Sequence, residues 1–206
     1  MNYNLSMENE IATLQARSTP PRLLLHACCA PCTSGCLDRV LPFFDVTVFY
    51  LNPNITEEAE YRLRAEELRR LLPLMPGPDG RVASYAEGPY EPDAWLSAVA
   101  GLEEEPEGGA RCAVCFRERL RASARYAEEH GFEYLTTTLT LSPLKNAALL
   151  NAIGEEEARA AGVKWLPSDF KKKDGYRHSI ERSREFGLYR QDYCGCVFSR
   201  RDRERE

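Results

Sequence analysis

The chain has 206 residues, a formal net charge of −5 and 43% hydrophobic residues, which is the composition of a soluble globular protein. A chain of this length buries about 70% of the surface that its unfolded form exposes, so its stability requires no disulfides. No stretch approaches the about 18 consecutive apolar residues of a membrane-spanning helix, and this excludes the transmembrane class.

Residues 1–20 (MNYNLSMENEIATLQARSTP) come first in chain order. They carry acidic and polar residues where a secretory signal peptide would have a basic start and an apolar centre. We therefore expect residues 1–20 to be a poorly ordered extension of a cytoplasmic protein. Residues 21–200 are expected to form a single α/β domain with a basic C-terminal segment, and residues 201–206 a charged tail.

Two strands and two helices are predicted in the next 50 residues. Arg22 to Ala27 (RLLLHA) is an apolar run that ends at Cys-Cys-Ala-Pro, which predicts a buried strand and a helix beginning near Pro31. Asp45 to Leu51 (DVTVFYL) predicts a second strand, which stops at Asn-Pro-Asn. Thr56 is the predicted N-cap of a helix that carries apolar residues on one face (Tyr61, Ala65, Leu68 and Leu72).

The second half of the chain continues this alternation. The predicted elements are a strand at Arg81 to Tyr85, helices around Asp93 to Leu102 and Cys112 to His130, a strand at Phe132 to Leu141 and, after further helices, a strand at Val163 to Leu166. Strands alternating with amphipathic helices predict a mainly parallel sheet covered on both faces. Sites in such folds form beyond the carboxyl ends of the strands, where Cys28 and Cys29 lie.

Charge is distributed unevenly along the chain. Residues 53–110 carry 13 acidic and five basic residues, whereas residues 164–206 carry 12 basic and eight acidic residues. The C-terminal quarter can therefore face phosphates although the whole chain is acidic. A solvated charged surface explains the same distribution equally well.

The eight cysteines form three groups. Structural disulfides rarely persist in a reducing compartment, and cysteines that serve as small hydrophobic residues would be scattered among apolar neighbours. These cysteines are instead flanked by Pro, Gly, Arg and Asp, a pattern that indicates metal binding or redox chemistry. The groups are Cys28, Cys29, Cys32 and Cys36; Cys112 and Cys115; and Cys194 and Cys196.

The C-x-x-C motif of Cys112 and Cys115 lies at the start of a predicted helix. The helix dipole lowers the pKa of thiols at that end, so the two can bind one ion or cluster. The motif supplies half of a four-ligand site, and the adjacent pair Cys28 and Cys29 is the tightest candidate for the other half. Neighbouring residues suit the separate irons of a four-iron cluster better than one zinc ion, which favours an iron–sulfur cluster.

Cys29-Ala-Pro-Cys32 has a second interpretation. It follows a strand and opens a helix, as the redox motif of thioredoxin-like thiol oxidoreductases does. Such an enzyme needs neither a second C-x-x-C nor a C-x-C motif, so the rest of the chain disfavours this alternative. Cys36, one turn further along the helix, is predicted to be a packed small residue.

Cys194 and Cys196 are separated only by Gly195. A disulfide between them would close a very small loop, and its strain would make it easily reduced, which suits electron relay. Gly195 supplies the backbone freedom that such a bond needs. Metal ligation and inert packing are the other two interpretations.

Six segments in order resemble the cobalamin-independent epoxyqueuosine reductases: HACCAPC, NPNITEEAEYRLR, RCAVCFRERL, TTTLTLSPLKN, DFKKKDGYRHS and LYRQDYCGCVFS. The resemblance extends from about Leu23 to Ser199. It implies a single catalytic domain with a Rossmann-like three-layer sandwich of the HUP and PP-loop type. It also implies the last step of queuosine biosynthesis, in which the epoxycyclopentane of epoxyqueuosine at the tRNA wobble position becomes a cyclopentene.

The resemblance also assigns roles to the cysteines. It makes Cys28, Cys29, Cys112 and Cys115 the ligands of a [4Fe-4S] cluster, and Cys194 and Cys196 the catalytic, redox-active pair. The SGGxDS phosphate loop of PP-loop ATPases is replaced here by residues 28–32, so we expect no ATP requirement, and the resemblance implies no cobalamin. An external donor is expected to supply the electrons.

Removal of the epoxide oxygen as water takes two electrons and two protons, and a Lewis-acidic metal lowers the barrier. A four-cysteine cluster has no free coordination site for that oxygen. Either the cluster only transfers electrons, or a second, mononuclear iron lies beside it with Cys32 and the C-x-C pair as candidate ligands. The candidate proton donors are Asp169, Asp192, Tyr193 and His26, of which His26 fits a hydrogen-bonded core residue equally well.

The expected partner is tRNA carrying epoxyqueuosine. Its phosphates are expected to contact Lys171, Lys172, Lys173, Arg177 and Arg190, and Tyr176 or Tyr189 can stack on a splayed anticodon base. A solvated loop is the alternative for the lysine run. For the whole chain, the remaining alternative is a zinc-stabilised nucleic-acid-binding module without catalysis.

Overall fold

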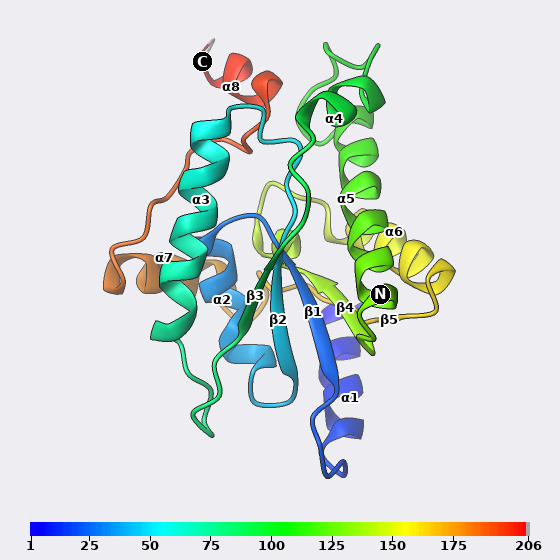
Figure 1. Ribbon diagram of the computed structural model, residues 1–206, viewed down its shortest axis with the longest axis vertical. Helices are drawn as coiled ribbons and strands as arrows, with labels where there is room; N and C mark the ends of the chain where they lie inside the picture. The colour runs from blue at the N-terminus through cyan, green and yellow to red at the C-terminus, as the bar shows by residue number, and fades with distance from the viewer. Residues whose placement is uncertain (205–206) are drawn as a thin grey trace.

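A five-stranded, all-parallel sheet with helices on both faces forms the centre of the molecule (Figure 1). The computed structural model describes residues 1–204. The strands are β1 (Arg22–Ala27), β2 (Asp45–Tyr50), β3 (Ser84–Glu87), β4 (Tyr134–Thr137) and β5 (Lys164–Trp165), in the spatial order β3-β2-β1-β4-β5. The predicted Rossmann-like three-layer α/β sandwich is confirmed.

Eight α-helices are present in residues 1–204. They are α1 (Tyr3–Leu14), α2 (Ala30–Val40), α3 (Glu58–Leu71), α4 (Pro92–Ala98), α5 (Ala110–Glu129), α6 (Ala147–Ala160), α7 (Gly175–Glu185) and α8 (Val197–Glu204), with 3-10 turns η1 (Leu72–Leu74) and η2 (Thr138–Leu141). None of these described helices has both the length and the hydrophobicity needed to cross a membrane.

The two faces of the sheet are covered by different helices, because successive side chains of a strand point to opposite faces. Leu23 and Leu25 of β1 pack into the larger core cluster, which also contains residues of α1, α2 and α3. Leu24 packs on the opposite face with Ala124 of α5 and Ala158 of α6. Every position of β1 after Arg22 is therefore buried, as its apolar sequence predicts.

The strand order reverses between β1 and β4, because the chain first builds outward through β2 and β3 and then returns to the other side of β1. Ligands of open parallel sheets bind beyond the carboxyl ends of the strands at such a switch point. Cys28 and Cys29 follow β1 directly, and Thr138 follows β4. The fold therefore places the first cysteine group at the position that favours a binding site.

His26 is buried in the sheet beneath this switch point. Its Nδ1 lies 2.8 Å from Thr137 Oγ1 of β4, and its Nε2 lies 3.1 Å from the carbonyl oxygen of Leu51 after β2. Burial lowers the pKa of His26 to about 3, so the ring is neutral at physiological pH. The geometry is that of a core residue that joins three strands.

The N-terminal segment differs from the expectation of a poorly ordered extension. Residues 3–14 form α1, whose N-cap Asn2 accepts a hydrogen bond from the backbone N–H of Leu5. Met7, Ile11 and Leu14 recur at helical spacing and are buried in the larger core. This apolar stripe, which lies among polar residues, is the physical reason that the segment folds onto the domain.

Several element boundaries also differ from the sequence predictions; strand β3, for example, is Ser84–Glu87 instead of Arg81 to Tyr85. Helix α3 begins at Glu58 with Glu57 as N-cap, so Thr56 does not cap it. Strand β4 ends at Thr137, and residues 138–141 form η2 instead of continuing the strand. Of the predicted charged tail at 201–206, residues 201–204 belong to α8, and residues 205–206 lie outside the described residues.

Met7→Ala is expected to lower the free energy of unfolding by about 2–5 kcal/mol, because it leaves a cavity where a side chain only 1% exposed was packed. Leu5→Ala is the control on the same helix. Leu5 is 50% exposed, so its truncation should change the free energy by less than about 0.5 kcal/mol. Urea unfolding measures both, and equally small effects would contradict the packing of α1 on the core.

Candidate metal and redox site

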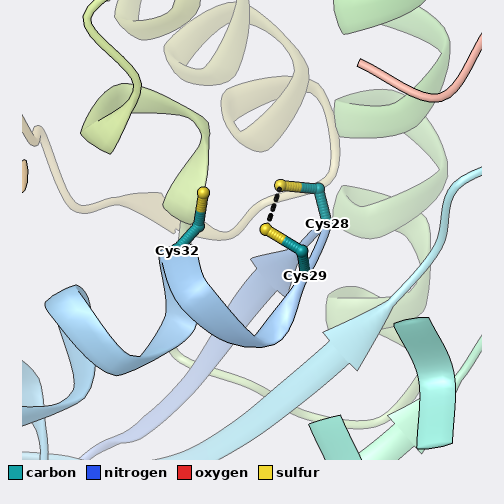
Figure 2. A group of neighbouring side chains, drawn as sticks. All are labelled: Cys28, Cys29 and Cys32. Atoms are coloured by element: carbon teal, nitrogen blue, oxygen red, sulfur yellow. Dashed lines mark hydrogen bonds between the residues drawn. The ribbon is translucent and has the colours of Figure 1, made fainter. Parts of the chain in front are cut away.

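Three thiols gather where β1 gives way to α2 (Figure 2). The sulfur atoms of Cys28, Cys29 and Cys32 all lie within 4.8 Å of one another, and those of Cys28 and Cys29 are 3.6 Å apart. Cys29 is the extended N-cap residue of α2, so the chain turns between Cys28 and Cys32 and brings the three sulfurs to one side. This trio can hold a metal ion.

The spacing within the trio suits the ligands of a single ion. A tetrahedral ion with metal–sulfur bonds of about 2.3 Å holds its sulfur ligands about 3.8 Å apart. The Cys28–Cys29 distance of 3.6 Å is close to that value. Ligands of a four-iron cluster bind separate irons and lie farther apart. A four-iron cluster on Cys28 and Cys29 would therefore require these two sulfurs to move apart from their present 3.6 Å.

The trio is electrostatically prepared to hold negative charge. Hydrogen bonds from Cys29 and Cys32 lower the pKa of Cys28, and the positive charges of Arg119 and Lys145 lower it further. The same contact with Cys28 raises the pKa of Cys29 to about 12 and also raises that of Cys32. Of the three thiols, Cys28 is therefore the one that loses its proton most readily.

The other two cysteine groups meet in a pocket. Cys112 and Cys115, in the first two turns of α5, line it together with Cys194 and Cys196. The pocket contains about 540 Å³ of empty space, including the part open to solvent. Its remaining lining residues are Asn54, Trp95, Glu107, Gly108, Arg111, Phe116, Leu144, Lys145, Asn146, Leu149 and Ser199. The C-x-x-C and C-x-C motifs thus face one space.

The trio and the pocket are neighbours. Cys28 and Cys112 pack against the same apolar cluster, formed by Phe116, Leu120, Leu139, Leu150 and Ile153. One member of each predicted ligand pair, Cys28 and Cys112, therefore lies at a shared apolar wall, although Cys112 and Cys115 are outside the 4.8 Å group.

Two buried cations stand among thiols from all three groups. The Arg119 guanidinium interacts electrostatically with Cys115, Cys28 and Cys194. The Lys145 Nζ lies 3.7 Å from the sulfur of Cys194 and 3.8 Å from a carboxylate oxygen of Glu107. Burial lowers the pKa of Lys145, but the negative charges of Cys194, Cys28 and Glu107 outweigh that effect and raise it. Lys145 is therefore a permanent cation here.

Sequence reasoning assigned no role to Arg119, Lys145 or Trp95. A signal existed for Arg119, because it follows Cys115 by four residues and so shares its face of the helix. Lys145 lies within the segment TTTLTLSPLKN, and nothing in that segment indicates that its side chain lies beside thiols. Trp95 reaches the pocket only because α4 packs on α5.

The C-x-C motif is held by contacts to its backbone. Arg64, which is buried and paired with Glu60, donates hydrogen bonds to the carbonyl oxygens of Cys194 (3.1 Å) and Tyr193 (3.4 Å). The backbone N–H of Cys194 donates to the Ser199 hydroxyl at 3.2 Å. Both cysteines are free thiols. The backbone of the motif is therefore held beside the pocket by hydrogen bonds, and its two thiols are available for disulfide formation or metal binding.

The candidate proton donors lie elsewhere. Asp169, Asp192 and Tyr193 do not belong to the described lining of the pocket, and His26 lies in the core. Asp169 forms an ion pair with Lys171 at 3.2 Å. Of the charged residues near the thiols, Lys145 and Glu107 line the pocket instead.

Most of the expected tRNA-contacting residues form intramolecular contacts. Lys171 pairs with Asp169, Lys173 with Glu8 and Arg177 with Glu181, while Arg190 donates to the Ser179 carbonyl and the Ser183 hydroxyl. Lys172 is exposed and its side chain pairs with none of residues 1–204. Lys171 also donates to the carbonyl oxygen of Lys145 at 3.4 Å, so the basic segment adjoins the pocket.

Gly195→Ala is expected to destabilise the protein and displace the C-x-C motif. Gly195 has φ +113°, and an added Cβ would lie 2.8 Å from Ile55 Cγ1. Gly162→Ala is the control, because Gly162 also has a positive φ (+69°) but open space around it. Thermal and urea unfolding should show Gly195→Ala to be less stable than the control by about 1–3 kcal/mol. Equal stabilities would contradict the close approach.

The chain is similar in sequence to proteins of one family. The family described as Epoxyqueuosine reductase QueH matches residues 23–202 of the chain. The protein named Epoxyqueuosine reductase QueH from Streptococcus pyogenes serotype M1 is 41% identical over 199 residues, which cover 97% of this chain and 78% of the relative.

Two further relatives carry the same name. The Staphylococcus epidermidis protein is 40% identical over 97% of this chain and 84% of its own length. The Thermotoga maritima protein is 34% identical over 86% of this chain and 89% of its own length. With a family match over most of its length and relatives of this similarity, the chain belongs to the epoxyqueuosine reductase QueH family.

Proposed function

We propose that this chain reduces epoxyqueuosine to queuosine at the wobble position of tRNA. The proposed machinery is an iron–sulfur cluster bound by Cys28, Cys29, Cys112 and Cys115, with Cys194 and Cys196 as a redox-active pair. The observation that carries the proposal is the meeting of all three cysteine groups around two buried cations at the switch point of the sheet. The names of its relatives supply the substrate.

The donor set fits an anionic metal centre. Its thiols are largely buried, and Arg119 and Lys145 supply positive charge where thiolates would otherwise be unpaired. When bound, an iron–sulfur cluster would supply electrons one at a time from an external donor. Cys32 is the thiol of the trio that the cluster leaves unassigned, and its sulfur lies within 4.8 Å of those of Cys28 and Cys29, so it is the candidate ligand of a second, mononuclear metal beside the cluster.

Cys194 and Cys196 can together supply the electrons and protons that the reaction requires. Opening the epoxide to an alkene releases its oxygen as water and requires two electrons and two protons. Two thiols supply both as they form a disulfide, and the external donor then restores the thiols. Lys145, whose Nζ lies 3.7 Å from the Cys194 sulfur, offers a fixed positive charge to the oxygen as negative charge develops on it.

Two polar atoms of the pocket are available to orient the substrate. Asn54 Oδ1 and Arg111 Nη2 are buried and have no hydrogen-bond partner among the described residues. The other terminal nitrogen of Arg111 donates to the carbonyl oxygens of Leu102, Glu103 and Glu105, which holds the guanidinium in place. An acceptor and a donor at fixed positions suit the hydroxyl groups of a cyclopentane ring.

The basic segment supports contact with tRNA phosphates. The ion pairs of Lys173 and Arg177 involve exposed side chains, and such pairs contribute only about 0–1 kcal/mol, so phosphates can replace their carboxylates. Tyr176 is exposed and lies under the Arg190 guanidinium at 5.9 Å, whereas the Tyr189 hydroxyl is bonded to Glu60. Tyr176 is therefore the better candidate to stack on a base.

Anaerobically reconstituted protein is expected to be brown and, when reduced, to convert epoxyqueuosine-containing tRNA to queuosine-containing tRNA. Nucleoside analysis by mass spectrometry measures the conversion. Colourless protein that carries zinc, or loaded and reduced enzyme without conversion, would contradict the proposal. Careful reconstitution that never yields more than four irons per chain would count against the second metal.

Cys194→Ser and Cys196→Ser are each expected to abolish conversion, because a lone thiol cannot supply two electrons, while the absorption of the cluster remains. Cys36→Ala is the matched control. Cys36 is fully buried in the larger core, so its loss should reduce stability and leave iron content and conversion unchanged. Iron and sulfide analysis accompanies the assay, and full activity of either serine variant would exclude the redox-pair role.

Lys172→Ala is expected to weaken tRNA binding and to reduce the slope of log K against log salt by about 1, because one phosphate contact is lost. Lys164→Ala is the control, since Lys164 is exposed at the start of β5, away from the carboxyl ends of the strands. Fluorescence anisotropy over a salt series measures both. Unchanged slopes for both variants would exclude Lys172 as a phosphate contact.

A further inference from the structure

Two buried N–H donors beside Cys115 have no acceptor. Trp95 is 2% exposed and Arg119 is 1% exposed, yet Trp95 Nε1 and Arg119 Nε make no hydrogen bond with the described residues. A buried donor without a partner costs about 1–3 kcal/mol. Phenylalanine or leucine could fill the same space without that cost, so two such donors at one place require an explanation.

Both donors lie beside one sulfur. Trp95 and Cys115 belong to the same packed cluster, with Val99 and Cys196, because α4 lies against the first turns of α5. Arg119 lies one turn after Cys115 on that helix. Burial raises the pKa of Cys115 to about 11, whereas the charge of Arg119 and N–H contacts from Trp95 and Arg119 lower it. The sulfur therefore lies within reach of both groups.

The positive charge of Arg119 is a second reason to expect a thiolate at Cys115. Among residues 1–204, the Arg119 guanidinium donates to Asn52 Oδ1, a neutral acceptor, and no carboxylate pairs with it. A buried guanidinium without a counter-ion is costly. A thiolate accepts shorter and stronger hydrogen bonds than a thiol, so an ionised Cys115 would satisfy both donors and the charge together.

We propose that the Trp95 indole N–H and the Arg119 guanidinium form a two-donor cradle for the metal-bound thiolate of Cys115, and that this cradle raises the reduction potential of the centre. The inference rests on the proposed function, which makes Cys115 a cluster ligand. Hydrogen bonds to ligand sulfurs stabilise the more negative, reduced state. Trp95 and Arg119 are thus positioning residues that act through Cys115.

Trp95→Phe tests the cradle because it removes the N–H and keeps an aromatic ring. The matched control is Trp165→Phe, in which the lost N–H was bonded to Asn151 at 3.0 Å, whereas Trp95 Nε1 has no such acceptor. Each reconstituted protein is analysed for iron and sulfide, and its midpoint potential is measured by a dye-mediated titration followed by electron paramagnetic resonance.

The expected result is a more negative midpoint potential for Trp95→Phe, with iron content and visible spectrum like those of the wild type. A tenfold loss in the equilibrium constant for one-electron reduction corresponds to about 59 mV. The control should match the wild type. Resonance Raman bands of the Fe–S(Cys) stretch should also rise in Trp95→Phe only, because the sulfur then donates more strongly to iron.

A potential and a stretch in Trp95→Phe equal to those of wild type would overturn the inference. A wild type that binds no cluster would instead refute the proposed function, so the two failures are distinguishable. If Trp95→Phe alone loses iron while its apo form melts like the control, the donor is needed to hold the thiolate, which supports the cradle. If its apo form is destabilised, the midpoint potential of Arg119→Lys decides, since this variant keeps the charge and removes the Nε–H. A more negative potential supports the cradle, and an unchanged potential overturns it.

Discussion

Charge balance in a buried space is the constraint on which the site depends. Arg119 is buried with only a neutral hydrogen-bond acceptor, and its charge is met by sulfur atoms from three distant segments. Burying a cation without compensation costs several kcal/mol, so the thiols and the cations hold each other in place. The same helix, α5, supplies both the proposed ligand Cys115 and the counter-charge Arg119, one turn apart.

The topology of the sheet decides where this balance is built. Reversal of the strand order between β1 and β4 opens the carboxyl ends of both strands to one region, and His26 joins β1 to β4 beneath it. Arg64 of helix α3 donates a hydrogen bond to the backbone of the C-terminal segment. The segments that carry cysteines are consequently fixed by core packing and by backbone hydrogen bonds, while their sulfur atoms remain free to react.

Much of the fold could be predicted from local pattern. The apolar run of Arg22–Ala27 predicted β1 with its observed bounds, because a strand buried on both faces requires apolar residues at successive positions. Strand β4 was predicted too long, since β-branched residues at 138–141 also suit the 3-10 turn that follows. The helix at Tyr3–Leu14 was missed because its three apolar residues, Met7, Ile11 and Leu14, stabilise a helix only by packing on the core of the domain.

The sequence by itself determined the chemistry available to this protein: eight thiols in three groups, an alternating α/β pattern and a C-x-C motif whose glycine permits a positive φ. Tertiary structure alone decided which thiols become neighbours and what faces them. Cys32 joins Cys28 and Cys29, Lys145 meets Cys194, and Trp95 meets Cys115. Such contacts join residues far apart in the chain or set by a turn of backbone, and local spacing contains no information about the distances that folding creates between them.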